Sequence, residues 1–478
     1  MSVESCSSAD SGSATAVATP EPEVILSVGS RKTVSQEKCL ATISSVQQTP
    51  FTIGPCSATF TTPKRKGRYI LSTENTLKNS LLMSVGYLEL ANAGDFAANV
   101  WNDVPPPKFA IVLMAIGGTL ALSIPYFAFK DACSSWANIR LLRRERIRIR
   151  ATTKKGSSDE ETQLSISEQH SQRVLLDMTR RELGSEIVDR LGMEILMGCG
   201  ALLVGVGTLM AIGGADPEVF IASNLLSGYV GNSWAASYSI VNAAWSIFIW
   251  IRAHRHGRAA SRFLPVDVNN SLVQPRLGSI QMHSIINGAT GLIAGAASLL
   301  TATLWWGYVV LAPCIISMIW CNYYWRHTIG YDRPIIQHLP NPLNWAEIVG
   351  ELGFIEHTRI ILTDEALQLP SSDLPTAILG LRSLPSIIDF IVRNDLFEDF
   401  SRRILQDESL ASSLIVISDG NSAVIASDAI LTANEEQARQ VTEIAHTCIR
   451  VAGPRHLVYR QRYLLDILGS ALCHESNS

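Results

Sequence analysis

The feature that most constrains this chain is an uncharged stretch of 49 residues, Leu277–Trp325, which contains no Lys, Arg, Asp or Glu. Because an α-helix rises 1.5 Å per residue, about 20 residues cross the roughly 30 Å hydrocarbon layer of a bilayer. The stretch is long enough for two crossings and a tight turn, and Trp305-Trp306-Gly307 lies where the turn is expected. We therefore predict a helical hairpin inside a membrane.

Three more uncharged stretches precede this hairpin. Phe109–Phe129 and Ile195–Ala215 have 21 residues each, which suits one crossing apiece. Val219–Ile251 has 33 residues, too few for two crossings, so we expect Val219–Val230 to be interfacial or re-entrant. The predicted spans are approximately 109–129, 195–215, 231–251, 279–304 and 308–325. The fold class is an α-helical multi-pass membrane protein with about five transmembrane helices in a membrane domain, 109–325.

Lys and Arg near the span ends predict how these helices are oriented. Seventeen of them fall on one side of the predicted spans, whereas Lys108 is alone on the other. Cytosolic segments carry an excess of Lys and Arg. The basic loop 130–194, the loop 252–277 and the acidic domain 328–478 are therefore expected in the cytosol.

The chain before the first span is harder to place. Residues 1–76 are rich in Ser and Thr and predict a disordered tail. In the pre-membrane segment 77–108, Glu89 and Asp95 interrupt the apolar residues, so we expect an interfacial helix rather than a span. Five spans place residues 1–108 opposite the cytosol. The alternatives are that one apolar stretch is re-entrant, or that Leu77–Val100 crosses after all.

The C-terminal domain, 328–478, is long enough for a small core of its own and is expected to be mostly helical. It has 11 Lys and Arg against 20 Asp and Glu. Apolar residues four apart predict one helix from Ile388 to Ile404, and Leu414–Ile425 reads as a β-hairpin. Another helix is expected to stop at Gly453-Pro454, before a last helix that carries Leu464–Leu472.

A basic stretch just past the first span is the first candidate contact surface. Its arginines are Arg140, Arg143, Arg144, Arg146, Arg148 and Arg150. Interleaved with apolar residues, they suit an anionic leaflet, where each cation contributes about 1 kcal/mol. Ser157 and Ser158 precede acidic residues and are candidate phosphorylation sites whose phosphates would weaken that contact. The alternatives are a topology signal alone, or docking of the acidic C-terminal domain as a protein partner.

Polar residues inside the spans form a candidate intramembrane cluster: Asn242, His283 and Asn287. Such side chains usually hydrogen-bond between packed helices, and the alternative is that they line a route for small molecules. No Asp, Glu, Lys or Arg lies inside any predicted span. Because ion-coupled pumps need such groups in the membrane, the pattern disfavours a coupled pump.

Enzyme motifs give little support for catalysis. The sequence has no P-loop, GxGxxG, GxSxG or HExxH, and its nine cysteines form no CxxC pair. His327 and Asp332 fit the HxxxxD pattern of glycerolipid acyltransferases, but the basic substrate motif of that family is missing downstream. We therefore predict no catalytic, cofactor-binding or metal-binding residue, no cofactor and no nucleic-acid partner.

Several segments resemble a family of fungal multi-pass integral membrane proteins. They are Gly94–Asp103, Asn224–Ser233, Asn242–Trp245, Leu396–Phe400 and Arg460–Leu465. The resemblance covers about residues 90–470. It implies a fungal source and the same layout of membrane domain and cytosolic tail, and it carries over no catalytic residue.

The leading functional prediction is a non-catalytic integral membrane protein that organises lipid or protein partners at the cytosolic face. The alternative is a passive or auxiliary component of small-molecule transport, and a membrane-bound enzyme comes third. Plasma membrane and internal membranes are not distinguished.

Overall fold

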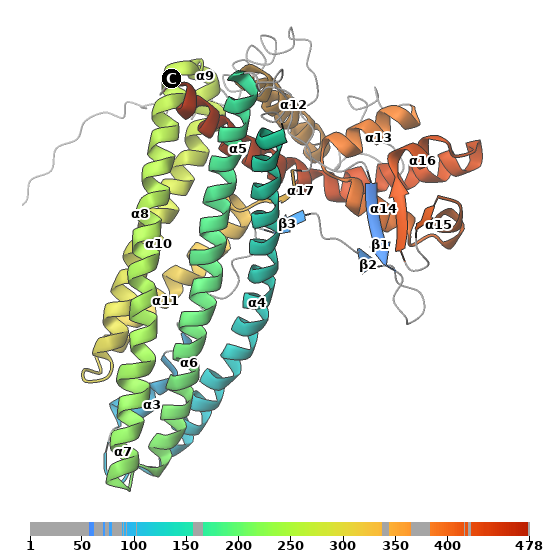
Figure 1. Ribbon diagram of the computed structural model, residues 1–478. Helices are drawn as coiled ribbons and strands as arrows, with labels where there is room; N and C mark the ends of the chain where they lie inside the picture. The colour runs from blue at the N-terminus through green and yellow to red at the C-terminus, as the bar shows by residue number, and fades with distance from the viewer. Residues whose placement is uncertain are drawn as a thin grey trace, which may run out of the picture. The chain divides into compact units, whose positions relative to one another are not determined.

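The computed structural model describes residues 57–61, 70–71, 76–78, 88, 90–91, 93–101, 103–155, 166–336, 344–364, 383–414, 416–418 and 422–476. Within these residues, five helical segments are long and apolar enough to cross a membrane (Figure 1). They are Lys108–Ala151, Glu168–Gly213, Pro217–Phe263, Val266–Leu300 and Gly307–Ile329. Each predicted span overlaps one of them, in the predicted order, although spans 195–215 and 279–304 extend a few residues past the helix ends, so the prediction of five long apolar helices is confirmed.

The first two spans continue as helices well past their apolar parts. Helix α4 is one helix, Lys108–Lys155. The second begins as α5 (Ile166–Ser185), passes through the π-helical turn η2 (Glu186–Gly192) and continues as α6 (Met193–Met210) and η3 (Ala211–Gly213). The segment 130–194, predicted as a loop, therefore consists largely of helix. The extension of α4 packs on α5, because apolar side chains recur at helical spacing within the charged sequence.

The third long helix also starts earlier than predicted. It consists of α7 (Pro217–Asn224), η4 (Leu225–Gly231) and α8 (Asn232–Phe263). Asp216 caps its first turn by accepting from the Glu218 amide at 2.9 Å, and Pro217 suits the first helical position. Val219–Val230, predicted as interfacial or re-entrant, is thus continuous with the third span.

The uncharged stretch forms the expected hairpin. After α9 (Val266–Val268) and η5 (Asn269–Val273), helix α10 runs over Gln274–Leu300. Helix α11 (Gly307–Tyr324) and η6 (Trp325–Ile329) follow. The turn at 301–306 contains Trp305 and Trp306, which confirms the predicted position. Helices α8 and α10 approach closely: a methyl group on Gly295 of α10 would lie 2.4 Å from the Ser239 hydroxyl of α8.

The described residues just before α4 pack against the helical bundle. They include β3 (Thr76–Lys78), η1 (Ala93–Asp95) and α3 (Phe96–Val100). Their contacts on α4 move toward the start of that helix as their own residue numbers rise. The Lys78 carbonyl accepts a hydrogen bond from Asn138. Buried clusters then contain the pairs Leu88 and Ala128, Ala91 and Ala121, and Ala98 and Ala110. Asn138 and Ala110 are about 42 Å apart along an α-helix. The segment is therefore an element of the bundle and differs from the interfacial helix predicted for Leu77–Val100.

The N-terminal strands pair with C-terminal ones. A four-stranded antiparallel sheet has the order β2 (Ile70–Leu71), β1 (Ser57–Thr61), β6 (Ser422–Ala426) and β5 (Val416–Ser418). A second sheet pairs β3 with β4 (Asp332–Pro334). The β5–β6 hairpin was predicted, whereas β1 falls in the segment 1–76 that was predicted to be disordered. The rest of that prediction lies mostly outside the described residues.

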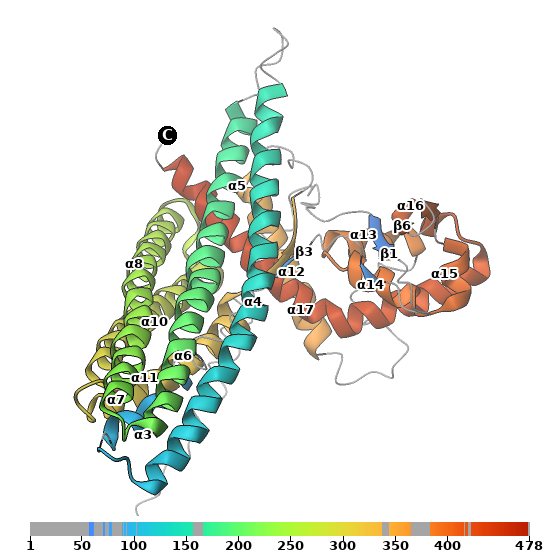
Figure 2. The same cartoon turned by 60° about the horizontal axis from the view of Figure 1, so that its bottom comes forward.

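The remaining helices are α12 (Trp345–Asp364), α13 (Leu384–Arg393), α14 (Phe397–Ile404), α15 (Glu408–Leu414), α16 (Ser427–Leu431) and α17 (Glu435–Glu475). The predicted Ile388–Ile404 helix is broken between α13 and α14, where Asp395 has φ of 59°. Helix α17 continues through Pro454, so the predicted stop there is wrong. Packing on α12, α14, α5 and α8 along its length outweighs the hydrogen bond that proline removes (Figures 1 and 2).

Candidate functional site

A buried arginine joins β4 to the two long helices at one end of the bundle. Arg333 has no exposed side-chain surface. Its guanidinium donates to Glu145 of α4 at 2.8 and 2.9 Å and to Glu182 of α5 at 2.5 and 2.8 Å. The Ile336 amide also donates to Glu145, at 2.6 Å. Because five N–H groups of Arg match carboxylate oxygens in pairs, this one side chain can satisfy both buried acids.

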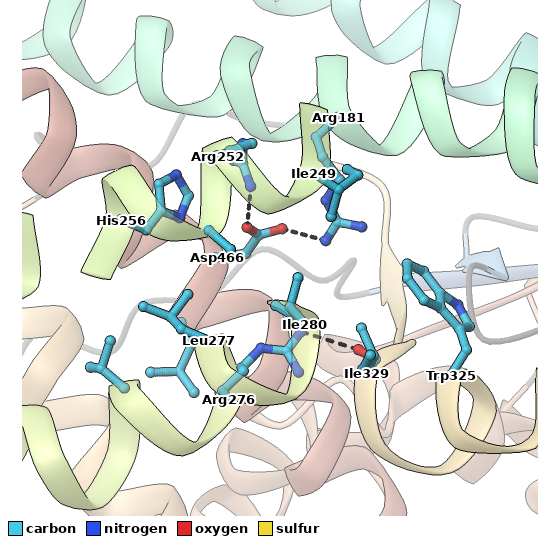
Figure 3. A pocket seen from close by; sticks show the side chains of 13 residues that line it. Arg181, Ile249, Arg252, His256, Arg276, Leu277, Ile280, Trp325, Ile329 and Asp466 are labelled. Carbon is cyan, nitrogen blue, oxygen red and sulfur yellow. Dashed lines mark hydrogen bonds and ion pairs between the residues drawn. The ribbon is translucent and has the colours of Figure 1, made fainter. Parts of the chain in front are cut away.

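A second group of charges ties α17 to the same end of the bundle. Asp466 accepts from Arg181 of α5 at 2.5 Å and from Arg252 of α8 at 2.7 Å (Figure 3). Arg252 also donates to Asp177 at 3.2 Å and to the Ser470 hydroxyl at 2.8 Å. These bonds hold α17 against both helices.

The Tyr331 hydroxyl connects the two groups. Its oxygen lies 3.0 Å from Glu182 and 3.1 Å from both Asp466 and Arg181. We call Glu145, Arg181, Glu182, Arg252, Tyr331, Arg333 and Asp466 the ionic junction. Burial raises the pKa of Tyr331 well above its usual range, so the phenol stays protonated and can donate. Burial opposes the charge on Asp466, but Arg181 and Arg252 outweigh it and hold its pKa well below the usual range.

A small cavity opens beside Asp466 (Figure 3). Polar side chains on its wall are Arg181, Arg252, His256, Arg276 and Asp466, and the others are mostly apolar. Its volume is about 30 Å³. Asp466 on its wall is already paired with Arg181 and Arg252, so the ionic junction is suited to attachment of α17 to the bundle.

Helix α17 also reaches a second buried ionic cluster, six residues earlier. Glu351 of α12 accepts from Arg460 of α17 at 2.9 Å and from Arg393 of α13 at 2.5 Å. The Tyr463 hydroxyl donates to Asp395, the residue with positive φ, at 2.7 Å. Helix α17 thus links the core of the C-terminal domain to the bundle. Arg460 makes the ion pair with the domain, and Asp466, about two turns later, makes the ion pairs with the bundle.

The predicted basic stretch lies on the outward extension of α4. Arg140, Arg143, Arg144, Arg148 and Arg150 are exposed there. Arg146 is half-buried and donates to the Leu176 carbonyl and the Thr179 hydroxyl. Glu145, in the middle of the stretch, points into the ionic junction. The C-terminal domain contacts this stretch through Arg333, which pairs with Glu145. Ser157 and Ser158 lie outside the described residues.

The structure brings together two of the three predicted intramembrane polar residues. Asn287 Nδ2 of α10 donates to Asn242 Oδ1 of α8 at 3.0 Å. Asn242 is only 1% exposed, so this pair works as an interhelical hydrogen bond. His283 lies farther along α10, with its ring centroid 5.1 Å from that of Trp325.

The weaker candidates occupy ordinary structural positions. The His327 ring lies 4.2 Å from the Tyr323 ring, and Asp332 is paired with Lys78 in the two-stranded sheet. Among the described residues, no group of three or more His, Cys, Asp or Glu could hold a metal ion.

Sequence reasoning missed an acidic residue inside the bundle. Asp95 has no exposed surface and accepts from the Tyr308 hydroxyl at 2.7 Å and from Asn99 at 2.9 Å. The available signal was the spacing of small residues around it, Ala91, Gly94 and Ala98, which suits close helix packing. Gly94 does lie against α4, where its added methyl would be 3.0 Å from the Gly117 carbonyl.

Comparison with known proteins gives no further guide: no family model, curated protein or solved structure matches the chain. The resemblance to fungal multi-pass membrane proteins stays a prediction.

Proposed function

We propose that the chain is a multi-pass integral membrane protein that crosses the bilayer six times, with both ends of the described chain in the cytosol. The support is the distribution of exposed apolar side chains. Nearly all large apolar side chains that are exposed in the described residues lie between Phe109 and Tyr323. Those outside this range are Leu90, Phe96, Val104, Ile360, Leu431 and Val451. Soluble monomers rarely expose so much contiguous apolar surface.

The sixth crossing lies between Lys78 and Trp101, whose described residues pack against the bundle. Its start pairs with β4 near the ionic junction, and its end leads into α4 at the opposite end. Six crossings return the N-terminal strands to the side of the C-terminal domain, where β1 pairs with β6. This arrangement agrees with the seventeen-to-one distribution of Lys and Arg without moving the N-terminal segment across the membrane.

The proposed role is non-catalytic: the protein holds a cytosolic domain in a fixed position on the membrane, where it organises lipid or protein partners. The observation that carries this proposal is the pairing of Asp466 with Arg181 and Arg252, because it fixes α17 to two long helices. The exposed arginines of α4 provide a neighbouring surface for anionic lipid or an acidic protein.

Proximity labelling from the C-terminus tests this role. We expect Asp466→Asn to change the set of labelled neighbours, because its neutral amide leaves two buried arginines without their shared counter-charge. Glu436→Gln, at an exposed position of the same helix, should leave the set unchanged. Identical labelling by the wild type and Asp466→Asn, with both proteins folded, would contradict a role that depends on the fixed position.

One observation favours a second function, in small-molecule passage across the membrane. The pattern that disfavoured a coupled pump was the lack of acidic residues in the predicted spans, and Asp95 lies among those helices. Flux of small cations into vesicles containing the protein, compared with Asp95→Asn, tests this alternative. A membrane-bound enzyme stays third, and loss of lipid turnover in His327→Ala would support it.

A further inference from the structure

A polar cluster surrounds Asp95, and the proposed scaffold role does not use it. Four elements meet there: η1 supplies Asp95, α8 supplies Asn232, the end of α10 leads into Thr301, and α11 supplies Tyr308. Asn232 Nδ2 lies 3.5 Å from the Asp95 carboxylate and 3.4 Å from the Thr301 hydroxyl. Asn99 donates to both Asp95 and Tyr308. The cluster is therefore a continuous set of oxygens and amides.

The Asp95 carboxylate lacks a counter-charge within this cluster. Its hydrogen-bond donors are the neutral groups of Tyr308, Asn99 and Asn232. Among the described residues, no Lys, Arg or His forms an ion pair with it. An isolated buried carboxylate is costly, so it either takes up a proton or binds a cation.

Asn232 offers an unused acceptor next to Asp95. Its side chain is fully buried and its Oδ1 has no hydrogen-bond partner, whereas its Nδ2 lies on the Asp95 side and donates to the Gly228 carbonyl at 3.2 Å. A half-turn of the amide exchanges its oxygen and nitrogen and brings Oδ1 to the Asp95 side in place of that bond. There the oxygen can bind a cation together with the carboxylate, and a buried acceptor left without a partner costs about 1–3 kcal/mol.

We propose that this cluster binds one monovalent cation of sodium size, held by the Asp95 carboxylate, Asn232 Oδ1 and the Thr301 and Tyr308 hydroxyls. All the ligands are oxygens, which suit hard cations. A single carboxylate balances a single positive charge, whereas buried divalent ions usually draw on several acidic ligands. Asn99, which donates to Asp95 and Tyr308, is only half-buried and lies at the rim of the cluster.

Thermal unfolding of the full-length protein in detergent tests the site, with sodium chloride compared with choline chloride at equal ionic strength. We expect the wild-type Tm to rise with sodium concentration, because a ligand that binds only the folded state stabilises it. Asp95→Asn should remove this dependence and should be at least as stable as the wild type in choline chloride, since it carries no uncompensated charge. Glu194→Gln alters another buried carboxylate, bonded to Ser135, and should keep the sodium response.

A second variant keeps the test decisive if Asp95→Asn fails to fold. Thr301→Val removes one neutral ligand, and we expect it to raise the sodium concentration for half-maximal stabilisation about tenfold. Saturable binding of radioactive sodium to the wild type gives an independent measurement. Equal wild-type Tm in sodium and choline, together with no saturable sodium binding, would overturn the proposal and assign a proton to Asp95. Neither result depends on the cytosolic role proposed above.

Discussion

Arg333 and Glu145 form a two-pronged ion pair, with N–O distances of 2.8 and 2.9 Å, in which neither side chain is exposed. The partners are 188 residues apart in the chain. Glu145 lies within a stretch of α4 that otherwise carries arginines, and Arg333 lies in the acidic C-terminal domain. Glu145, the one acidic residue between Arg140 and Arg150, is thus the residue of that stretch that makes the buried contact.

Replacing Arg333 should be severely destabilising. Arg333→Met leaves Glu145 and Glu182 buried without a cation, a change expected to cost about 3–5 kcal/mol of folding free energy. Thermal unfolding in detergent measures the loss as a lower Tm. Adding Glu145→Gln and Glu182→Gln should restore part of it, because no buried charge then stays unpaired. A Tm like that of the wild type in Arg333→Met would mean that the pair is not formed.

An exposed ion pair provides the matched comparison. Arg402 pairs with Asp399 at 3.0 Å, and its side chain is 54% exposed. Arg402→Met should therefore cost less than about 1 kcal/mol.

Acid should weaken the attachment of α17. The pKa of Asp466 is held well below its usual range, so its contribution to stability is complete above the unfolded value of about 3.9 and is lost as pH falls toward the folded value. The Tm difference between the wild type and Asp466→Asn should be constant near neutral pH and shrink in strong acid. A difference that grows as pH falls has the wrong sign for this account.

Contact between α17 and α8 can be tested without altering charge. A methyl group on Gly469 would lie 2.2 Å from His256 Nδ1, whereas at Gly278, within α10, nothing lies within 4 Å. Gly469→Ala should lower the Tm because the helices must separate. Gly278→Ala should instead stabilise the protein by roughly 0.5–1 kcal/mol through helix propensity. Equal effects at the two sites would argue against the α17–α8 contact.

The exposed arginines of α4 should attract anionic partners. Changing Arg143, Arg144 and Arg148 to Gln is expected to reduce the amount of anionic phospholipid that co-purifies with the protein. The reason is that each arginine contributes up to about 1 kcal/mol to the binding free energy of an anionic surface. Arg258→Gln, at an exposed site on α8, is the control. Unchanged lipid with reduced cross-linking to other proteins would assign this surface to a protein partner.

The five apolar helices and the hairpin turn could be predicted because their signals are local: uncharged length, and flanking arginines. The path of Leu88–Trp101 could not. Its acidic Asp95 argues against a crossing until Tyr308, Asn99 and Asn232 are known to surround it. Likewise β1 is too short to predict alone, since its partner β6 is more than 360 residues away.

The charged clusters could not be predicted either, because their partners are far apart in the sequence. Glu145 looks like one acid among arginines, and the ion pairs of Asp466 come from α5 and α8, more than 200 residues before it. The predicted helix end at Pro454 was wrong because the sequence does not reveal the packing that keeps α17 helical on both sides of this proline.

The location of the two chain ends tests the central claim most directly. Epitope tags at the N- and C-termini of the full-length protein can be probed in cells permeabilised at the plasma membrane alone, with protease protection of isolated membranes as a second readout. Six crossings predict that both tags are accessible from the cytosol. A protected N-terminal tag with an accessible C-terminal tag would indicate five crossings and would contradict the path assigned to residues 78–101.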